Sequence, residues 1–252
     1  MPPFPFPFIN RSTTVIAAPG DTDPSFGVDG LVLHTPGSVA LNLSNTPSTV
    51  ISLSDGTLLV AGHSENGQTV SGVADTDILL ARYRANGQLD TRFGHQGIVT
   101  TATSTAYSRV SGMLEQADGK LLVYGIHAQL RAADRGLVVR YLPDGRLDPG
   151  FADGGILSLT LGSGYDQINA AIQQADGKIV VAGAGLHSDD DFVLARLNND
   201  GSLDTTFGTD GLVITDFGGS HIAYDLIAQN GKLVAVGSGG NGVSGITIAR
   251  YL

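Results

Sequence analysis

The chain repeats one sequence pattern four times, and a repeat of this size constrains the fold more than any other feature. The pattern opens with Asp-x-x-Phe-Gly-x-x-Gly. Its aspartate and phenylalanine are Asp23 and Phe26, Asp90 and Phe93, Asp148 and Phe151, and Asp204 and Phe207. A second element ends in an arginine, and the four arginines, 54 to 58 residues apart, are Arg82, Arg140, Arg196 and Arg250. A fixed period of this length predicts one supersecondary unit used repeatedly.

Each repeat contains apolar runs of strand length separated by turn residues. The runs after the phenylalanine are 31–35, 98–101, 156–159 and 212–215, the next are 49–53, 109–114, 168–172 and 223–228, and the last are 78–83, 137–141, 192–197 and 246–251. A further run follows each Asp-Gly or Asn-Gly pair, which predicts a hairpin with a type I′ turn. Short runs at this spacing, with almost no helical period, predict antiparallel meanders.

Four-stranded units whose apolar faces cannot be buried alone favour an all-β fold, a β-propeller of four antiparallel blades. Residues 21–252 form the predicted propeller domain, with repeats at roughly 21–84, 85–142, 143–198 and 199–252. A ring closed within one chain is the preferred arrangement. The alternatives are half of an eight-bladed ring shared by a dimer, and an all-β solenoid.

The segments GQLDTRFGHQG, QADGKIVVAG and DFVLARLNNDGSLDTTFGTDG resemble the delta-60 repeat, a β-propeller repeat of bacterial, often surface-associated proteins. The resemblance covers residues 21–252 and departs from the pattern at Ala152 and Asn230. It implies a propeller fold and a bacterial origin. It implies no established activity, so it provides no catalytic residues for this chain.

Composition restricts the partners. A formal net charge of −10 and a pI near 4.8 disfavour nucleic acid and anionic membranes, because both select basic surfaces. No apolar stretch is long enough to span a membrane, and the N-terminus lacks the pattern of a cleavable signal. The chain has no cysteine, so packing alone stabilises it. The expected location is the outside or surface of a bacterial cell, with the cytoplasm as the alternative.

The residues present in every copy are interpreted as structural. Arg82, Arg140 and Arg196 each precede a motif aspartate by eight positions, as Arg82 precedes Asp90, and this spacing predicts an ion pair that fixes a turn. The motif phenylalanines, such as Phe93, are predicted to fill the space between neighbouring blades. A single active site does not need four copies of these residues.

Candidate binding residues lie where the copies differ, between the third and fourth runs. They are His63, Glu65 and Asp75 in the first copy, His127 in the second, and His187, Asp189, Asp190 and Asp191 in the third. The simplest interpretation is solvated loops on one face of the propeller. A calcium site at His187, Asp189, Asp190 and Asp191 is an alternative, because calcium prefers oxygen ligands. The sequence has no recognisable motif of a catalytic metal or nucleophile.

Residues 1–20 form a leader rich in proline and phenylalanine. Prolines alternate with Phe4, Phe6 and Phe8, which favours an extended conformation. Three interpretations stay open: a disordered leader, docking on the same chain, or an assembly arm that inserts into a neighbour.

The repeat, the charge and the absence of a catalytic motif favour a non-enzymatic binding or assembly module of a bacterial surface or secreted protein. The expected partner is a protein or a second copy. A glycan is less favoured, because only 6% of residues are aromatic and tryptophan is absent. The alternative is a metal-dependent hydrolase or lactonase, which needs ligands from several blades at the central opening.

Overall fold

The computed structural model describes residues 19–34, 44–70, 72–103, 107–128, 133–186, 189–240 and 245–252. The first sheet contains β1 (Asn45–Ser52), β2 (Leu58–Val70), β3 (Val73–Tyr83) and β4 (Ile98–Thr101). The second contains β5 (Ser108–Glu115), β6 (Leu121–His127), β7 (Arg135–Tyr141) and β8 (Ile156–Leu159). The third contains β9 (Gln167–Gln173), β10 (Ile179–Leu186), β11 (Asp190–Leu197) and β12 (Leu212–Thr215). The fourth contains β13 (His221–Gln229), β14 (Lys232–Gly239) and β15 (Gly245–Tyr251).

Every sheet is an antiparallel meander in sequence order, and the strand that follows the motif phenylalanine forms the outer edge of the first three sheets. The prediction of an all-β propeller with four antiparallel blades is confirmed. The fourth sheet has three strands among the described residues. The predicted strand 31–35 is not formed by its described part, which contains one isolated bridge between Val28 and Leu31. Among the described residues, no strand lies beside it to pair with.

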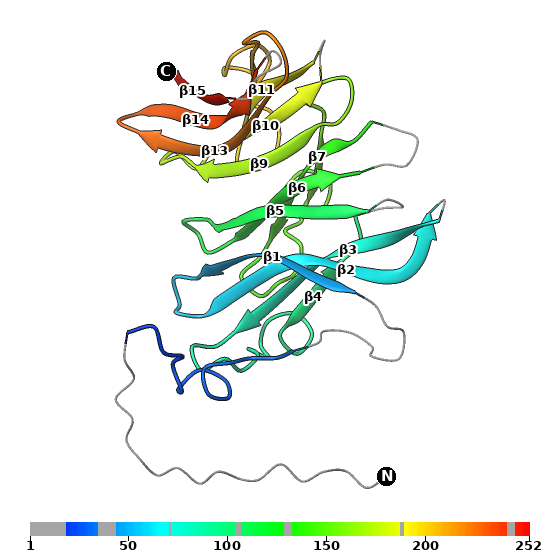
Figure 1. The fold of residues 1–252 in the computed structure, drawn as a ribbon, viewed down its shortest axis with the longest axis vertical. Coiled ribbons are helices and arrows are strands. Elements are labelled where there is room, and N and C mark those ends of the chain that lie inside the picture. Colours follow the sequence, from blue (N-terminus) through cyan, green and yellow to red (C-terminus); the bar gives the residue numbers. More distant parts are fainter. Residues whose placement is uncertain are drawn as a thin grey trace, which may run out of the picture.

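The sheets are stacked in sequence order, with the first at one end and the fourth at the other (Figure 1). The first strands of the meanders, β1, β5, β9 and β13, lie next to one another along the stack. The preferred arrangement, a ring closed within one chain, is therefore not formed by the described residues. Both ends of the stack are left open.

The hydrophobic core consists of three clusters, each between two consecutive sheets. Each cluster contains one motif phenylalanine: Phe93 in the first, Phe151 in the second and Phe207 in the third. The phenylalanines thus occupy the position between blades that the repeat predicts. Burial of one such side chain contributes about 2 to 3 kcal/mol to stability.

The turns before the third strand of each repeat differ from the prediction in the first three copies. In the first, Gly56 has a φ of 81° while Asp55 stays outside the left-handed region. The Asp55 carboxylate instead accepts a hydrogen bond from the backbone N–H of Thr57, 2.9 Å away. A type I turn followed by a left-handed glycine fits this geometry. In the fourth copy Asn230 and Gly231 both have positive φ, 52° and 75°, as the predicted type I′ turn requires.

Among the described residues, no helix is long and apolar enough to cross a membrane. Phe4, Phe6 and Phe8 of the leader lie outside the described residues, so the assembly arm stays a prediction.

Candidate functional site

The predicted variable loop of the first repeat is a long hairpin. His63 and Glu65 lie on β2 and Asp75 lies on β3, because the pairing of these two strands continues to Val70 and Val73. The interpretation of this segment as an irregular loop is therefore wrong. The sequence signal that it missed is the β-branched residues on both sides of the turn.

The polar side chains of this hairpin bind one another. The Asn66 side-chain amide donates to Asp75 at 2.9 Å and to Asp77 at 3.1 Å. Burial raises the pKa of the Asp77 carboxyl and lowers the pKa of the His63 imidazole, so both shifts favour the neutral forms. Asn66, Asp75 and Asp77 thus bind one another within one blade.

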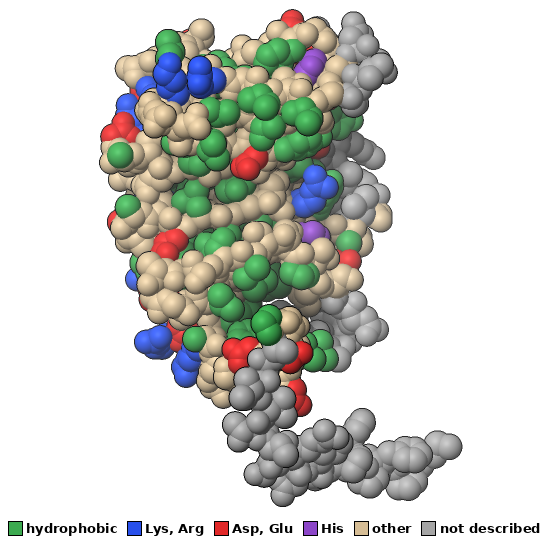
Figure 2. All heavy atoms as spheres, turned by 60° about the vertical axis from the view of Figure 1, so that its left-hand side comes forward, with side chains coloured by type: hydrophobic (Ala, Val, Ile, Leu, Met, Phe, Trp, Pro, Cys, Tyr) green, Lys and Arg blue, Asp and Glu red, His purple; other side chains and the backbone are tan. Residues whose placement is uncertain are grey.

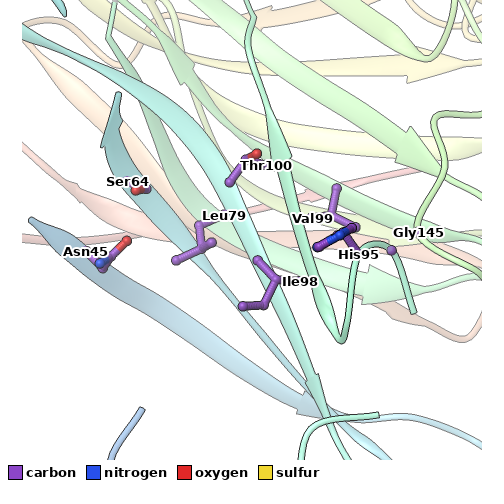
Figure 3. Close-up of a pocket in the computed structure, with 9 residues that line it drawn as sticks. Asn45, Ser64, Leu79, His95, Ile98, Val99, Thr100 and Gly145 are labelled. Carbon is purple, nitrogen blue, oxygen red and sulfur yellow. The ribbon is translucent and has the colours of Figure 1, made fainter. Parts of the chain in front are cut away.

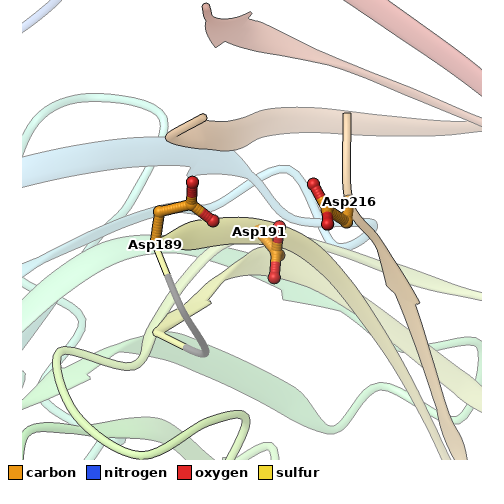
Figure 4. Close-up of side chains that lie close together, drawn as sticks. All are labelled: Asp189, Asp191 and Asp216. Carbon is orange, nitrogen blue, oxygen red and sulfur yellow. The ribbon is translucent and has the colours of Figure 1, made fainter. Parts of the chain in front are cut away.

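Three carboxylates of the third sheet come together (Figure 4). One oxygen each from Asp189, Asp191 and Asp216 lies within 4.8 Å of the others. Asp216 follows β12, which pairs with β11, and no local signal in the sequence connects it with Asp189 and Asp191. Asp190 is not a member of the cluster, and His187 lies outside the described residues. Calcium prefers such oxygen ligands, but clustered carboxylates alone do not identify a ligand.

The remaining candidate of the second repeat is His127, the last residue of β6. Its side chain is buried, and burial lowers its pKa. β2 and β6 end on the same side of the stack, as the equivalence of the repeats predicts (Figure 1). Among the described residues, His63 and His127 do not join the acidic cluster.

An open groove of about 560 Å³ lies over the first sheet (Figure 3). Its lining comprises Asn45, Ser64, Leu79, Gly94, His95, Ile98, Val99, Thr100 and Gly145. His95 is the one ionisable side chain among these residues, and Ser64 and Thr100 add two hydroxyls. No hydrogen bond joins His95 to either hydroxyl in the described part of the chain, so a nucleophile activated by a base is not assembled there.

The repeated motif forms the same junction in three copies. The guanidinium groups of Arg82, Arg140 and Arg196 pair with the aspartate eight positions later, at 2.8, 2.8 and 2.6 Å. Each guanidinium also lies over the ring of the motif phenylalanine, with its carbon 4.5 to 4.7 Å from the ring centroid. The ion pair follows from the sequence spacing. The stacking does not, because the residues are eleven positions apart on different segments.

Two of the three junctions also bind the next blade through the backbone. The backbone N–H of Gly94 donates to the carbonyl of Asp144, between β7 and β8 of the second sheet, at 2.8 Å, and that of Ala152 donates to Asp200, between β11 and β12 of the third sheet, at 2.7 Å. The Arg140 guanidinium donates to the backbone carbonyl of Asn199 in the same way. One arginine therefore stabilises its own turn, its phenylalanine and the neighbouring blade.

Acid should weaken the first junction. The hydrogen bond from Arg92, with further charge attraction from Arg82, lowers the pKa of the buried Asp90 carboxyl from 3.8 to about 2. A lowered native pKa stabilises the fold above the unfolded value, and this contribution, about 2 kcal/mol, is lost as pH falls from about 4 to about 2. Urea unfolding at several pH values should show a smaller loss over this window for Asp90→Asn than for the wild type.

The exposed carboxylate of Asp153 is the control for this experiment, and Asp153→Asn should retain the wild-type pH dependence. If the free energy of unfolding fell equally with pH in the wild type and in Asp90→Asn, the assignment of this pH dependence to Asp90 would be wrong.

The first and last copies of the junction are incomplete. Arg250 is exposed and has no carboxylate partner among the described residues. The carboxylate of Asp23 accepts hydrogen bonds from Ser25 and has no arginine beside it in the described part of the chain. The two halves of one junction thus lie at opposite ends of the stack.

The outer side of the first sheet carries an apolar groove of about 480 Å³. We define the N-terminal face by the apolar side chains of its lining: Phe26, Val32, Val50, Leu58, Val60 and Tyr83. Val50 is 59% exposed, whereas Met113, at the equivalent position of the second sheet, is 6% exposed. The groove therefore corresponds to one side of an interface between blades, and no second blade covers it among the described residues.

The outer side of the fourth sheet is the counterpart. We define the C-terminal face by Ile227, Val234, Ile246 and Ile248. Ile248 is 64% exposed, whereas the three equivalent residues of the other sheets, Leu80, Val138 and Leu194, are 0% exposed. These three side chains lie in the clusters between consecutive sheets. On the C-terminal face, the apolar position of Ile248 is therefore exposed, whereas the same position is buried in the three other blades.

Comparison with known proteins agrees with the repeat architecture. Residues 53–93, 116–151 and 174–207 match a family model described as a domain of unknown function (DUF5122) beta-propeller. Each matched segment ends at a motif phenylalanine and so contains one complete junction. The match supports a β-propeller repeat, and the name delta-60 stays a resemblance. No curated protein matches the chain.

Similar solved structures include an exo-1,5-alpha-L-arabinanase from a bovine ruminal metagenomic library, with 11% identity, a TM-score of 0.42, and coverage of 81% of this chain and 72% of that one. An alpha-L-arabinofuranosidase from Clostridium thermocellum has 12% identity and a TM-score of 0.37, covering 82% and 68%. A beta-xylosidase/alpha-arabinofuranosidase from a compost microbial metagenome has 11% identity and a TM-score of 0.39, covering 84% and 78%. These similarities assign no role to any residue of this chain.

Proposed function

We propose that the chain is a non-enzymatic assembly module of a bacterial surface or secreted protein, and that its two end faces bind protein. The observation that carries this proposal is the exposure of Ile248, whose equivalents in the three other blades are completely buried. Exposed apolar surface of this kind marks interaction sites in proteins. An open strand edge at the same end adds a second means of binding protein.

The surface charge favours the same class of partner. On the face shown in Figure 2, Lys and Arg side chains form small groups rather than a continuous basic band. With a net charge of −10, such a surface supports a protein partner better than nucleic acid.

The hydrolase alternative gains no specific support from the described residues. It requires ligands from several blades, whereas Asp189, Asp191 and Asp216 all belong to the third sheet or the connection that follows it. The open groove over the first sheet contributes His95 alone as an ionisable group.

A charge placed on either end face should block assembly. In sedimentation velocity, the wild-type mass should rise with concentration, and Ile248→Asp or Val50→Asp should remain at lower mass. Assembly of either variant would bury a carboxylate in an apolar contact, and the loss of its hydration costs free energy. Tyr165→Asp is the control, because Tyr165 is 72% exposed in the connection between β8 and β9, away from both ends.

A wild-type mass that is independent of concentration, and equal to that of both end-face variants, would contradict the proposed function. An equal effect of Tyr165→Asp would show that a general change in solubility caused the result.

A further inference from the structure

We propose that residues 20–34 of one copy complete the fourth sheet of a second copy. In this arrangement the segment pairs with the open edge of β15 and places Asp23 and Phe26 against Arg250. The inference rests on the proposed function, because it specifies how the two end faces meet. It adds a defined partner, a defined strand register and a defined ion pair.

The open edge of β15 determines the register. β3, β7 and β11 each pair with the strand that follows the motif phenylalanine, whereas β15 has no such neighbour among the described residues. In the third sheet, Ala195 lies opposite Leu212 and Val193 lies opposite Ile214. Transferred to the fourth sheet by the repeat, these pairs become Ala249 opposite Leu31, Ile248 opposite Val32, and Thr247 opposite Leu33.

The exposed side chains of both partners agree with this register. Val32 and Ile248, which lie opposite one another in this register, are exposed at 38% and 64%. The residue equivalent to Ile248 in the third sheet, Leu194, is buried in the cluster that contains Phe207. Joining a second copy would bury Ile248 and Val32 as Leu194 and Val213 are packed in the third blade, whereas Leu33 would stay exposed like its equivalent Ile214, which is 46% exposed.

The charges of the two ends are complementary. Three arginines of the repeat pair with a motif aspartate and stack on a motif phenylalanine. Arg250 has neither partner among the described residues, and Asp23 has no arginine. The half-buried Phe26 lies next to Asp23 in the position of the missing ring. A second copy supplies both partners at once.

The segment is already held in the required position. The backbone N–H of Gly27 donates to the carbonyl of Asn86 at 2.9 Å, as Gly94 donates to Asp144 at 2.8 Å within the stack. The His34 imidazole also contacts the Tyr83 hydroxyl at 3.0 Å. Its position on the first sheet thus matches that of an internal junction, and little ordering is needed on binding.

A second copy is the occupant that fits, because the two faces are the two halves of one repeated interface. The same chain cannot join them, since they lie at opposite ends of the stack (Figure 1). The contact is head-to-tail, and such contacts close into rings or continue as filaments. A discrete dimer would indicate a shared eight-bladed ring, and a series of larger masses would indicate a filament; either supports the proposal.

Disulfide trapping tests the register, and the natural absence of cysteine makes the chain suitable. Thr247→Cys and a tagged Leu33→Cys are purified separately, mixed and oxidised. The equivalent residues Val193 and Ile214 are directly opposite one another, and Cα atoms of opposite residues are about 4.5 to 5.5 Å apart, within disulfide range. We expect a mixed disulfide dimer as the main cross-linked product.

Val28→Cys is the matched control for Leu33→Cys, because Val28 is also highly exposed, at 77%, and lies outside the paired register. It should give several-fold less mixed dimer with Thr247→Cys. A charge swap provides a second test: Arg250→Glu added to the Thr247→Cys chain should reduce the product several-fold. Adding Asp23→Arg to the Leu33→Cys chain should then restore it.

The outcomes separate the two proposals. If sedimentation shows assembly through the end faces but Leu33→Cys gives no more product than Val28→Cys, this inference is wrong and the proposed function stands. If the wild type does not assemble at any concentration, both fail.

Discussion

Replacing Phe151 with alanine is expected to lower the free energy of unfolding by about 3 to 5 kcal/mol. The Phe151 ring is completely buried between the second and third sheets, and the Arg140 guanidinium covers it. Truncation leaves a cavity and removes the stacking at once. Because this cluster lies in the middle of the stack, the loss should affect the blades on both sides. Urea unfolding followed by circular dichroism measures it.

Phe26→Ala is the matched control for this prediction. Phe26 holds the same position in the repeat but is half-buried at the open end of the first sheet. At low protein concentration, its replacement should lower the free energy of unfolding by about 1 kcal/mol or less. Its main effect should be weaker assembly. Equal losses for Phe26→Ala and Phe151→Ala would show that burial between blades is not what the motif phenylalanine provides.

Arg140→Ala is expected to be nearly as destabilising, by about 3 to 5 kcal/mol, because it leaves the Asp148 carboxylate buried without its main partner. Arg140 and Asp148 are 2% and 6% exposed, and their charged atoms are 2.8 Å apart. The change also removes the hydrogen bond to Asn199 in the next sheet. Thermal and urea unfolding at neutral pH measure the effect.

Arg250→Ala provides the comparison, because Arg250 is the same repeat residue without a partner. At low protein concentration, we expect Arg250→Ala to change the free energy of unfolding by about 0.5 kcal/mol or less. A loss at Arg140 as small as that at Arg250 would mean that the buried junction contributes little to the stack.

Much of the fold could be predicted from the repeat, because each copy carries its own strand and turn signals. The runs at 98–101, 156–159 and 212–215 coincide with β4, β8 and β12. The run at 31–35 has the same composition, yet its described part is not a strand. A strand needs a hydrogen-bonding neighbour, and local sequence does not show whether that neighbour is present.

The site was less predictable for the same reason. The pairing of Arg140 with Asp148 follows from a fixed spacing, but its stacking on Phe151 requires a turn that brings the ring beneath the guanidinium. Asp216 joins Asp189 and Asp191 only because β12 pairs with β11. The open ends are recognised only from the structure, when the exposed fractions of equivalent residues in the four sheets are compared.

Hydrogen exchange of the wild-type β15 backbone at low and high protein concentration tests the central claim most directly. In the third sheet, the backbone N–H of Arg196, the equivalent of Arg250, donates to the carbonyl of Gly211, directly before the outer strand β12. Because N–H groups alternate in direction along an antiparallel strand, the amides of Ile248 and Arg250 face the open edge. The amides of Thr247 and Ala249 face β14 and serve as internal controls. Head-to-tail assembly predicts that exchange at Ile248 and Arg250 slows as concentration rises, while the controls stay slow throughout. Fast exchange at Ile248 and Arg250 at every concentration would contradict the account.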